Sequence, residues 1–511
     1  MLLHRSKLNL ISFLIVILIT TMELWKWIHF QKGKQGATRP KFVELRSSRW
    51  FIIFVISFAS ATDILLYGLI VPVAPTALQD RVGIPKERVQ AWTSILLALF
   101  SAALLAFSPI VGHIADRCES RRWPFLFGLV GLGAATALLC IGTNIGLWIA
   151  GRLFQGAAAA IVWVVGISLM ADNLGKDGLG QAIGYMAMAG SVGTLAGPLL
   201  GGVLYQECGY YAVFCLAFGL IGLDIFLRLI LIERRHAVKW LEPEMRPLAA
   251  TENEAGYTTN PSVPTGVHYN RTSPKITTSR SGSGHVSFLL SSSRLRVALL
   301  GNFTIALLLS SFENVLPLFV QETFGWQQGG QGLIFLPLIV PHVSEPVTGF
   351  IIDNYPQSPR YLTAGAFLVS APLLVILRLV TENSIHHKIL LCAILALLGI
   401  CFSVALPPLD LEVFHAVKER ECQDPDAFGP GGAVALAYGL TSMGFAAGSF
   451  IGSFLAGFLH QQAGWRTLGW VLGLITGISA IPVLLFMGGW ILHEAVRLED
   501  DTDDVDSTSA H

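Results

Sequence analysis

Charged residues are scarce in this sequence. Asp, Glu, Lys and Arg make up 13% of its 511 residues, against about 25% in an average soluble domain. The two signs balance, with 34 Lys and Arg and 34 Asp and Glu. The low charge excludes an ordinary cytosolic enzyme, and the apolar content excludes a disordered chain. Because there is no basic excess, nucleic acid is not expected as a partner.

Motifs of enzyme and metal chemistry are also missing. The seven cysteines form no Cys-x-x-Cys pair, and only Cys208 lies near a predicted outer loop, so we expect no extracellular disulfide framework. The sequence has no Gly-x-x-x-x-Gly-Lys-Ser/Thr phosphate loop, no His-Glu-x-x-His zinc motif and no nucleophile elbow in a supporting context. We therefore expect neither an enzyme nor a bound metal or cofactor.

Long apolar runs are abundant, since 53% of the residues are hydrophobic. A helix needs about 20 apolar residues to cross a bilayer, and twelve segments qualify. No remaining stretch is long enough for a separate soluble catalytic domain. The sequence thus predicts an all-α, multi-pass membrane protein. The predicted spans are 51–73, 91–113, 124–143, 146–171, 179–204, 210–232, 297–320, 331–352, 361–380, 388–407, 431–459 and 466–492.

The distribution of Lys and Arg predicts the orientation in the membrane. If the N-terminal arm is cytoplasmic, loops on that side hold 26 of these residues and loops on the other side hold five. Since cytoplasmic loops carry the excess of positive charge, we expect both termini in the cytoplasm. The expected organisation is an N-terminal arm (1–50), a six-helix bundle (51–232), a linker (233–296), a second bundle (297–492) and an acidic tail (493–511).

Two segments outside the bundles need separate interpretation. The linker 233–296 is rich in Ser, Thr, Pro and Gly and is predicted to be disordered. The apolar segment 8–22 is short for a span and lacks an Ala-x-Ala cleavage site. An uncleaved signal anchor, an interfacial helix and an extension upstream of initiation at Met22 all fit this segment. We favour the last two.

The two predicted bundles resemble each other. Gly112-His-Ile-Ala-Asp116 recurs as Gly349-Phe-Ile-Ile-Asp353, 237 residues later, and Asp63 is matched to Glu313, 250 residues later. Parallel six-helix halves are a transporter architecture, with the substrate site between them at mid-membrane. Four glycines of the first half also recur in the second at an offset of 255. They are Gly193, Gly197, Gly202 and Gly209, matched to Gly448, Gly452, Gly457 and Gly464.

Several motifs carry a resemblance to a known family. The segment Gly112-His-Ile-Ala-Asp116-Arg117-x-x-x-Arg121-Arg122 resembles a signature between spans 2 and 3. Gly151-Arg152-Leu-Phe-Gln155-Gly156 resembles a span 4 motif, and Gly190-x-x-Gly193-x-x-x-Gly197-Pro198-x-x-Gly201-Gly202 a span 5 motif of proton-coupled antiporters. The family is the major facilitator superfamily, and the resemblance covers about residues 45–495.

Within that superfamily the sequence is similar to the twelve-span drug:proton antiporters, with the character of filamentous-fungal members. Asp63-Ile-Leu-Leu-Tyr-Gly-Leu-Ile-Val-Pro72 is similar to span 1 of the vesicular amine transporters, and Phe312-Glu313-Asn-Val-Leu-Pro317 to their span 7. The amine transporters carry acidic residues in spans 10 and 11, where this sequence has Phe402 and Ser442. The resemblance implies two six-helix bundles around a central cavity.

Charged residues inside the predicted spans are the candidate proton and substrate sites. A carboxylate at mid-membrane costs about 2.5–3.5 kcal/mol, so Asp63 and Glu313 are expected to bind a proton or a cation in the central cavity. For Asp63 the alternative is a structural hydrogen bond to Ser60 or Thr62. Arg152 takes part in coupling in the family; a static ion pair is the alternative.

Three other groups are weaker candidates. His342 and Glu345 lie on one helix face, and a packing pair is favoured over a proton relay. Asp224 and Arg228, four residues apart, are expected to neutralise each other. Asp410 and Glu412 are expected at the membrane interface, and Trp163 is a candidate aromatic contact for a cation.

The remaining motif residues are expected to control gating. The glycines of span 5 permit close helix approach, and opposite charges between spans 2 and 3 can hold one conformation of the cavity. In the second half Asp353 is kept but Asn354 replaces the arginine, so that half should latch more weakly. The gating candidates are Gly112, Asp116, Arg117, Arg121, Arg122, Gly193, Gly197, Pro198, Gly201, Gly202 and Asp353.

The leading functional hypothesis is a proton-coupled antiporter that exports small amphipathic organic compounds, such as drugs or secondary metabolites. Its expected partners are a small-molecule substrate, protons and the lipid bilayer, with the proton gradient as energy source. It is expected to be monomeric in the plasma membrane, with the vacuolar membrane as alternative. Two other hypotheses stay open: a vacuolar or vesicular organic-cation or amine:proton exchanger, and a membrane sensor that does not transport.

Overall fold

The computed structural model describes residues 42–118, 120–175, 178–233, 240, 282–326, 328–355, 357–424, 427–428 and 432–490. Over these residues the secondary structure is helical and contains no strand. The apolar segment 8–22, the acidic tail and most of the predicted linker lie outside them. The end of that linker is helical, because α10 (Gly282–Leu290) falls within it.

The first half consists of six long helices behind the short helix α2 (Val43–Arg46). Side-chain caps start two of them: Ser48 accepts from the Phe51 amide and Asn144 from the Leu147 amide, which satisfies helix N–H groups that have no internal partner. The six helices are α3 (Arg49–Asp80), α4 (Lys86–Asp116), α5 (Arg122–Ile141), α6 (Ile145–Leu174), α7 (Leu179–Cys208) and α8 (Tyr210–Ile230).

The second half repeats this arrangement with more breaks. Its predicted span 331–352 is divided into short pieces, where Pro337 and Pro341 interrupt the helical hydrogen bonds. The elements are α11 (Ser293–Phe324), α12 (Gln328–Leu333), α13 (Leu336–Ile339), η3 (Val340–Ser344), α14 (Glu345–Asn354), α15 (Ser358–Ile376), η4 (Leu377–Leu379), α16 (Ile385–Gln423) and α17 (Val434–Phe486).

Eleven helices of the described residues are long and apolar enough to cross a membrane. The last of them, α17, contains two helices joined at Gly464, whose φ of 77° and ψ of 173° are not helical. Gly209, between α7 and α8, has nearly the same angles, φ 83° and ψ 178°. Both pairs of angles have a positive φ, a backbone conformation that favours glycine. The predicted all-α fold of two six-helix bundles is therefore confirmed, and the 255-residue repeat is visible in its turns.

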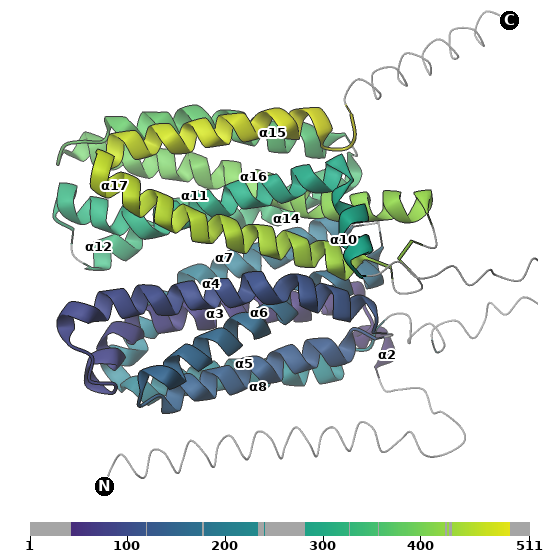
Figure 1. Cartoon of the computed structure of the whole chain (residues 1–511), viewed down its shortest axis with the longest axis horizontal. Coiled ribbons are helices and arrows are strands. Elements are labelled where there is room, and N and C mark those ends of the chain that lie inside the picture. The colour runs from purple at the N-terminus through teal and green to yellow at the C-terminus, as the bar shows by residue number, and fades with distance from the viewer. Residues whose placement is uncertain are drawn as a thin grey trace, which may run out of the picture.

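The halves lie side by side and meet at one end (Figure 1). The first half, purple to blue, contacts the second, green to yellow, through α4 against α17 and α7 against α14. The helices α2 and α10 lie at the end of the molecule where these contacts are made, which we call the α2 end.

The apolar core follows the same division. One cluster joins both halves at the α2 end, with Ile52 and Leu179 from the first half and Leu411 and Leu436 from the second. Farther from this end each half has a core of its own. The two bundles are thus closed against each other at the α2 end and packed separately elsewhere.

Candidate functional site

The first contact between the halves at the α2 end is made by Asp116, the last residue of α4. Its carboxylate accepts hydrogen bonds from the backbone amides of Ala435, at 2.9 Å, and Leu436, at 2.7 Å, in the first turn of α17. Amides at a helix start have no acceptor in their own helix, and the positive end of the helix dipole favours an anion. A side chain of one half therefore caps a helix of the other.

Arg121 connects this contact to the rest of the first half. Its guanidinium lies 3.0 Å from both Asp116 and Asp172 of α6. Burial disfavours the charged form, but the two carboxylates outweigh it and the pKa of Arg121 is raised. Of the other predicted arginines, Arg122 donates to the Leu229 carbonyl at 3.1 Å, whereas Arg117 is exposed beside the contact.

Asp353 makes the equivalent contact from the second half. The carboxylate of this α14 residue accepts from the amides of Gly180 and Gln181 at the start of α7, both at 2.8 Å. Glycines allow the backbones to come this close. A Cβ on Gly112 would lie 2.7 Å from the Leu436 Cα, and one on Gly349 would lie 2.6 Å from the Gln181 Cα.

The predicted glycine seam lies within the first half, between α7 and α3. A Cβ on Gly193 would lie 2.5 Å from the Ala61 carbonyl oxygen, and Gly197 and Gly201 meet the following turns of α3 in the same way. Pro198 packs against Gly68 of α3. Gly202 is a correction to the prediction: apart from its own helix, no atom lies within 4 Å of its Cβ position, because it is turned about 100° away from Gly201.

The glycine contacts also correct the register of the internal repeat. Gly193 and Gly197 meet the carbonyls of Ala61 and Leu65, whereas their matches Gly448 and Gly452 meet those of Phe303 and Leu307. Ala61 and Phe303 are 242 residues apart, as are Leu65 and Leu307. At that offset Asp63 corresponds to Ile305 and Glu313 to Val71. Asp63 and Glu313 therefore do not occupy matching places, and differ by about 12 Å along the helix axis.

Asp63 is buried inside the first half, with 2% of its surface exposed. One carboxyl oxygen accepts a hydrogen bond from Trp163 Nε1 of α6 at 3.1 Å, and the other has no partner. The structural alternative considered above is not seen: the Ser60 hydroxyl makes no hydrogen bond, and the Thr62 side chain interacts with Asp224 of α8 rather than with Asp63. The half-buried Trp163 ring covers a carboxylate that was expected to face the cavity directly.

Arg152 has a neighbour that the sequence analysis did not single out. The Arg152 guanidinium lies 5.4 Å from the centre of the Tyr67 ring and donates to Gln155 at 2.9 Å. Tyr67 of α3 is within electrostatic range of both Arg152 and the exposed carboxylate of Glu313 on α11. Tyr67 is therefore influenced by a cation of the first half and by an anion of the second.

In the second half, His342 and Glu345 form the predicted pair, with 2.6 Å between Nδ1 and Oε1. The Glu345 backbone also packs against Gly184 of α7, next to the Asp353 contact. Asp410 is a near neighbour that sequence reasoning placed at the interface. It accepts a hydrogen bond from Asn302 at 3.2 Å and lies within electrostatic range of Glu345.

Two further charged residues have partners that the sequence did not indicate. Glu412 is 2% exposed and is bound by Arg294, with its Oε1 and Oε2 lying 2.5 and 3.0 Å from two guanidinium nitrogens. Its expected place at the membrane interface stays a prediction. Arg228 does not pair with Asp224, but with Glu233 beyond the end of α8, at 3.2 Å. A spacing of four residues permits an ion pair but does not select the partner, and Glu233 follows closely enough to compete.

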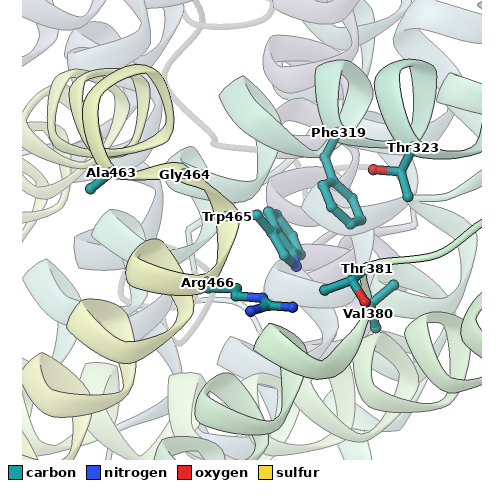
Figure 2. Close-up of a pocket in the computed structure, with 8 residues that line it drawn as sticks. All are labelled: Phe319, Thr323, Val380, Thr381, Ala463, Gly464, Trp465 and Arg466. Carbon is teal, nitrogen blue, oxygen red and sulfur yellow. The ribbon is translucent and has the colours of Figure 1, made fainter.

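A pocket of about 290 Å³ lies in the second half, away from these contacts (Figure 2). The rings of Phe319 and Trp465 stack at 3.8 Å on one side, and Thr381 and Arg466 add polar groups. All its lining residues belong to one half, so it is not a site between the bundles. No group of three His, Cys, Asp or Glu among the described residues could hold a metal ion.

Comparison with known proteins agrees with this architecture. The sequence model of the Major Facilitator Superfamily matches residues 11–421. The chain is 30% identical over 471 residues to the MFS-type transporter ppzB of Metarhizium rileyi, covering 88% of this chain and 97% of that one. It is 23% identical to a probable vesicular acetylcholine transporter-B of Danio rerio, covering 86% and 80%.

A shorter match, 30% identical over 192 residues, is to the class G tetracycline resistance protein of Vibrio anguillarum, covering 38% of this chain and 47% of that one. Among solved structures, the human organic anion transporter MFSD10 superposes with a TM-score of 0.59 at 19% identity, covering 85% of this chain and 99% of that one. The MFS-type, vesicular acetylcholine and organic anion proteins are transporters by name, and proteins of this family are not enzymes. This chain belongs to the Major Facilitator Superfamily.

Proposed function

We propose that this transporter is a proton-coupled antiporter that exports small amphipathic organic compounds by alternating access. The observation that carries the proposal is Asp63, a buried carboxylate in a membrane helix with one free oxygen and no ion-pair partner among the described residues. An uncompensated charge is costly there. Binding and loss of a proton change that cost, so they can drive a conformational equilibrium.

The contacts between the halves supply the conformational part of the proposal. Asp116 and Asp353 bond helix starts of the opposite half, and the apolar cores merge at the same end. Charge distribution predicts that this end is cytoplasmic. The conformation described here, closed at the cytoplasmic end, is then the one that releases substrate outward and takes up a proton. Both contacts must break before the cytoplasmic side can open.

Tyr67, Arg152 and Glu313 are the proposed substrate contacts. They combine an aromatic ring, a cation and an anion drawn from both halves, which suits a compound with both apolar and polar parts. The proton gradient is the proposed energy source. One proton crossing 100 mV releases about 2.3 kcal/mol, and one pH unit adds about 1.4 kcal/mol. Together these sustain a gradient of several hundredfold. We place the protein in the plasma membrane, acting as a monomer.

The test is proton movement in inside-out vesicles, followed with a pH-sensitive dye. The compounds are tetracycline, acetylcholine and benzoate, which cover different charges. We expect proton release on addition of at least one compound by the wild type, loss of that release in Asp63→Asn, and retention in Glu207→Gln, an exposed carboxylate at the far end of α7. Equal release in the wild type and Asp63→Asn would contradict the role of Asp63.

A second candidate function is amine:proton exchange at a vacuolar or vesicular membrane. It is favoured by the similarity to the vesicular acetylcholine transporter over 86% of the chain, and by an indole ring against the Asp63 carboxylate, an arrangement that suits a cation. Response to acetylcholine alone, with the protein in the vacuolar membrane, would select it. Binding of a compound without any proton movement would instead select a membrane sensor.

A further inference from the structure

The pocket of the second half lies where α11 ends, at the opposite end of the molecule from α2 (Figure 1). Its cation is Arg466, in the first turn of the helix that follows Gly464. The Arg466 side chain extends alongside the Trp465 ring toward Thr381 (Figure 2). It is exposed, and its guanidinium forms no ion pair or hydrogen bond among the described residues. The pocket therefore offers a guanidinium that is available to an anion, beside an apolar wall.

The acidic residues of the surrounding segments do not neutralise this guanidinium. Glu322, at the end of α11, lies 3.4 Å from His460 instead. Glu382, next to Thr381 in the sequence, forms no ion pair among the residues that the structure describes. Lys388 lies 5.5 Å from the centre of the Phe324 ring and adds a second positive charge near the end of α11. The charge around the pocket thus favours an anion.

The turn beside the pocket is built in the same way in both halves. The residue that follows the turn glycine is Tyr210 in the first half and Trp465 in the second. Tyr210 donates its hydroxyl to the Leu139 carbonyl at 2.6 Å, and Trp465 donates its Nε1 proton to the Leu377 carbonyl at 2.9 Å. Two aromatic side chains therefore occupy equivalent places, and the residues around them can be compared.

In the first half an arginine fills the space beside this aromatic ring. The Arg81 Cζ lies 4.1 Å from the centre of the Tyr210 ring, and two Arg81 nitrogens donate to the Tyr211 hydroxyl at 3.3 Å. At the 242-residue offset of α3 and α11, Arg81 corresponds to Thr323. At the 255-residue offset of the turn, Tyr211 corresponds to Arg466. The second half thus has a short side chain in place of the arginine, and a cation in place of its acceptor.

We propose that this pocket is a binding site for an organic anion with an apolar body, which Arg466 holds through a carboxylate or phosphate group. Phe319 stacks on Trp465 at 3.8 Å, and about 290 Å³ stays open, near the lower end of the range of about 300–1,000 Å³ that ligand pockets span. A guanidinium binds such oxyanions through two parallel hydrogen bonds, and Val380 and Trp465 supply apolar contact. The site is separate from Asp63, so it does not depend on the proposed antiport.

The test measures protection of the pocket from alkylation. Ala463 is exposed and lines the pocket, and it corresponds to the exposed Cys208 of the first half, a control within the same chain. The full-length Ala463→Cys variant in phosphatidylcholine nanodiscs is treated with N-ethylmaleimide, and mass spectrometry gives the rate at each position. Millimolar benzoate should slow alkylation at position 463 several-fold and leave Cys208 unchanged. No slowing at position 463, or equal slowing at both, would overturn the site.

Variants of the arginine test whether charge is recognised. In the same background, Arg466→Gln should abolish the protection by benzoate, and Arg466→Lys, which keeps a cation, should retain part of it. Benzamide has the same ring without the charge and should not protect. The alkylation rate at Cys208 reports whether each variant is folded. Protection that persists in Arg466→Gln, or equal protection by benzamide, would refute a site for anions.

The lipid composition distinguishes two sources of the anion. If an anionic lipid head group occupies the pocket, nanodiscs that contain phosphatidylglycerol should slow alkylation at position 463 without benzoate, and Arg466→Gln should reverse this. If the rate is the same in both kinds of nanodisc, the occupant is a dissolved anion such as benzoate. None of these measurements requires transport. Absence of proton movement in the vesicle assay would therefore refute the antiport and leave this site intact.

Discussion

Asp116 and Asp353 make the same kind of contact between the two halves. Each carboxylate accepts two backbone amides from the first turn of a helix in the opposite half, with lengths between 2.7 and 2.9 Å. Each lies next to a glycine that lets the helices approach. The two contacts differ in their ion pairs. Asp116 is bound by Arg121, which is bound in turn by Asp172. At the second contact Asn354 donates to its own helix, at the Phe350 carbonyl.

The second contact is therefore made although Asn354 replaces the arginine of the signature. The amides at the start of α7 bind Asp353 in the same way as those of α17 bind Asp116, since backbone donors are fixed by the helix itself. Arg121 adds a link from the first contact to α6, and therefore to the bundle that contains Asp63. The difference expected from the sequence, a weaker second latch, stays a prediction.

The largest effect is expected for Asp116→Ala. This change leaves two helix-start amides without an acceptor, each at a cost of about 1–3 kcal/mol, and it removes one of the two carboxylates that bind the buried Arg121. The closed state at the α2 end should be depopulated. Spin labels at the exposed residues Ile114 and Tyr355, in opposite halves, would report a longer distance. An unchanged distance distribution would show that the apolar core alone keeps the halves closed. Glu207→Gln, at an exposed site at the far end of α7, serves as control.

Substitution of either glycine should have a smaller and nearly equal effect. In Gly112→Ala and in Gly349→Ala the new methyl group meets backbone atoms of the opposite helix, and overpacking of this kind costs about 1–3 kcal/mol. Both variants should widen the same spin-label distance and slow transport several-fold. A clear difference between the two would show that the contacts are unequal in packing as well as in charge.

Asp353→Asn is expected to be milder than Asp116→Ala. The amide side chain keeps an oxygen that can accept one helix-start N–H. Loss of hydrogen bonds to a charged group costs about 1.5–3 kcal/mol, of which the retained bond recovers a part. The fraction of closed protein, read from the same labels, should fall between those of Gly112→Ala and the wild type. An effect equal to that of Asp116→Ala would refute the weaker latch.

The smallest effect is expected for Gly202→Ala. Nothing lies within 4 Å of the new methyl group, so its cost should stay within about 0.5 kcal/mol. Thermal unfolding of Gly202→Ala and Gly201→Ala compares the two neighbours directly. Only Gly201→Ala should lower the melting temperature, since its methyl group meets the Leu69 backbone. Equal destabilisation would place Gly202 in the seam after all.

Much of the fold was predictable because membrane spans, turn glycines and cytoplasmic signatures are local patterns. Gly209 and Gly464 share a conformation as well as a sequence context, and both aspartates of the repeated signature cap a helix. Predictions that required two distant elements to be paired were less accurate. Asp63 was matched to Glu313 because both are acidic, but the sequence does not show which turns of α3 and α11 contact the glycines.

The candidate site shows the same limit. An ion pair between Asp224 and Arg228 was a reasonable expectation from helix spacing, but the Glu233 carboxylate lies just past the helix end and binds the arginine. Tyr67 carried no signal in the sequence, because a tyrosine in an apolar run has no distinctive pattern. Tyr67 became a candidate because Arg152 of α6 and Glu313 of α11 both influence it. Only the packing of α3, α6 and α11 determines this.

The apolar core shared by the two halves has a consequence for temperature. Opening the α2 end would separate Ile52 and Leu179 from Leu411 and Leu436 and expose them to water. Exposure of apolar surface carries a positive heat-capacity change, and the hydrophobic contribution to closure weakens on cooling. The balance between the two conformations should therefore shift toward the open α2 end in the cold, with a curved van't Hoff plot.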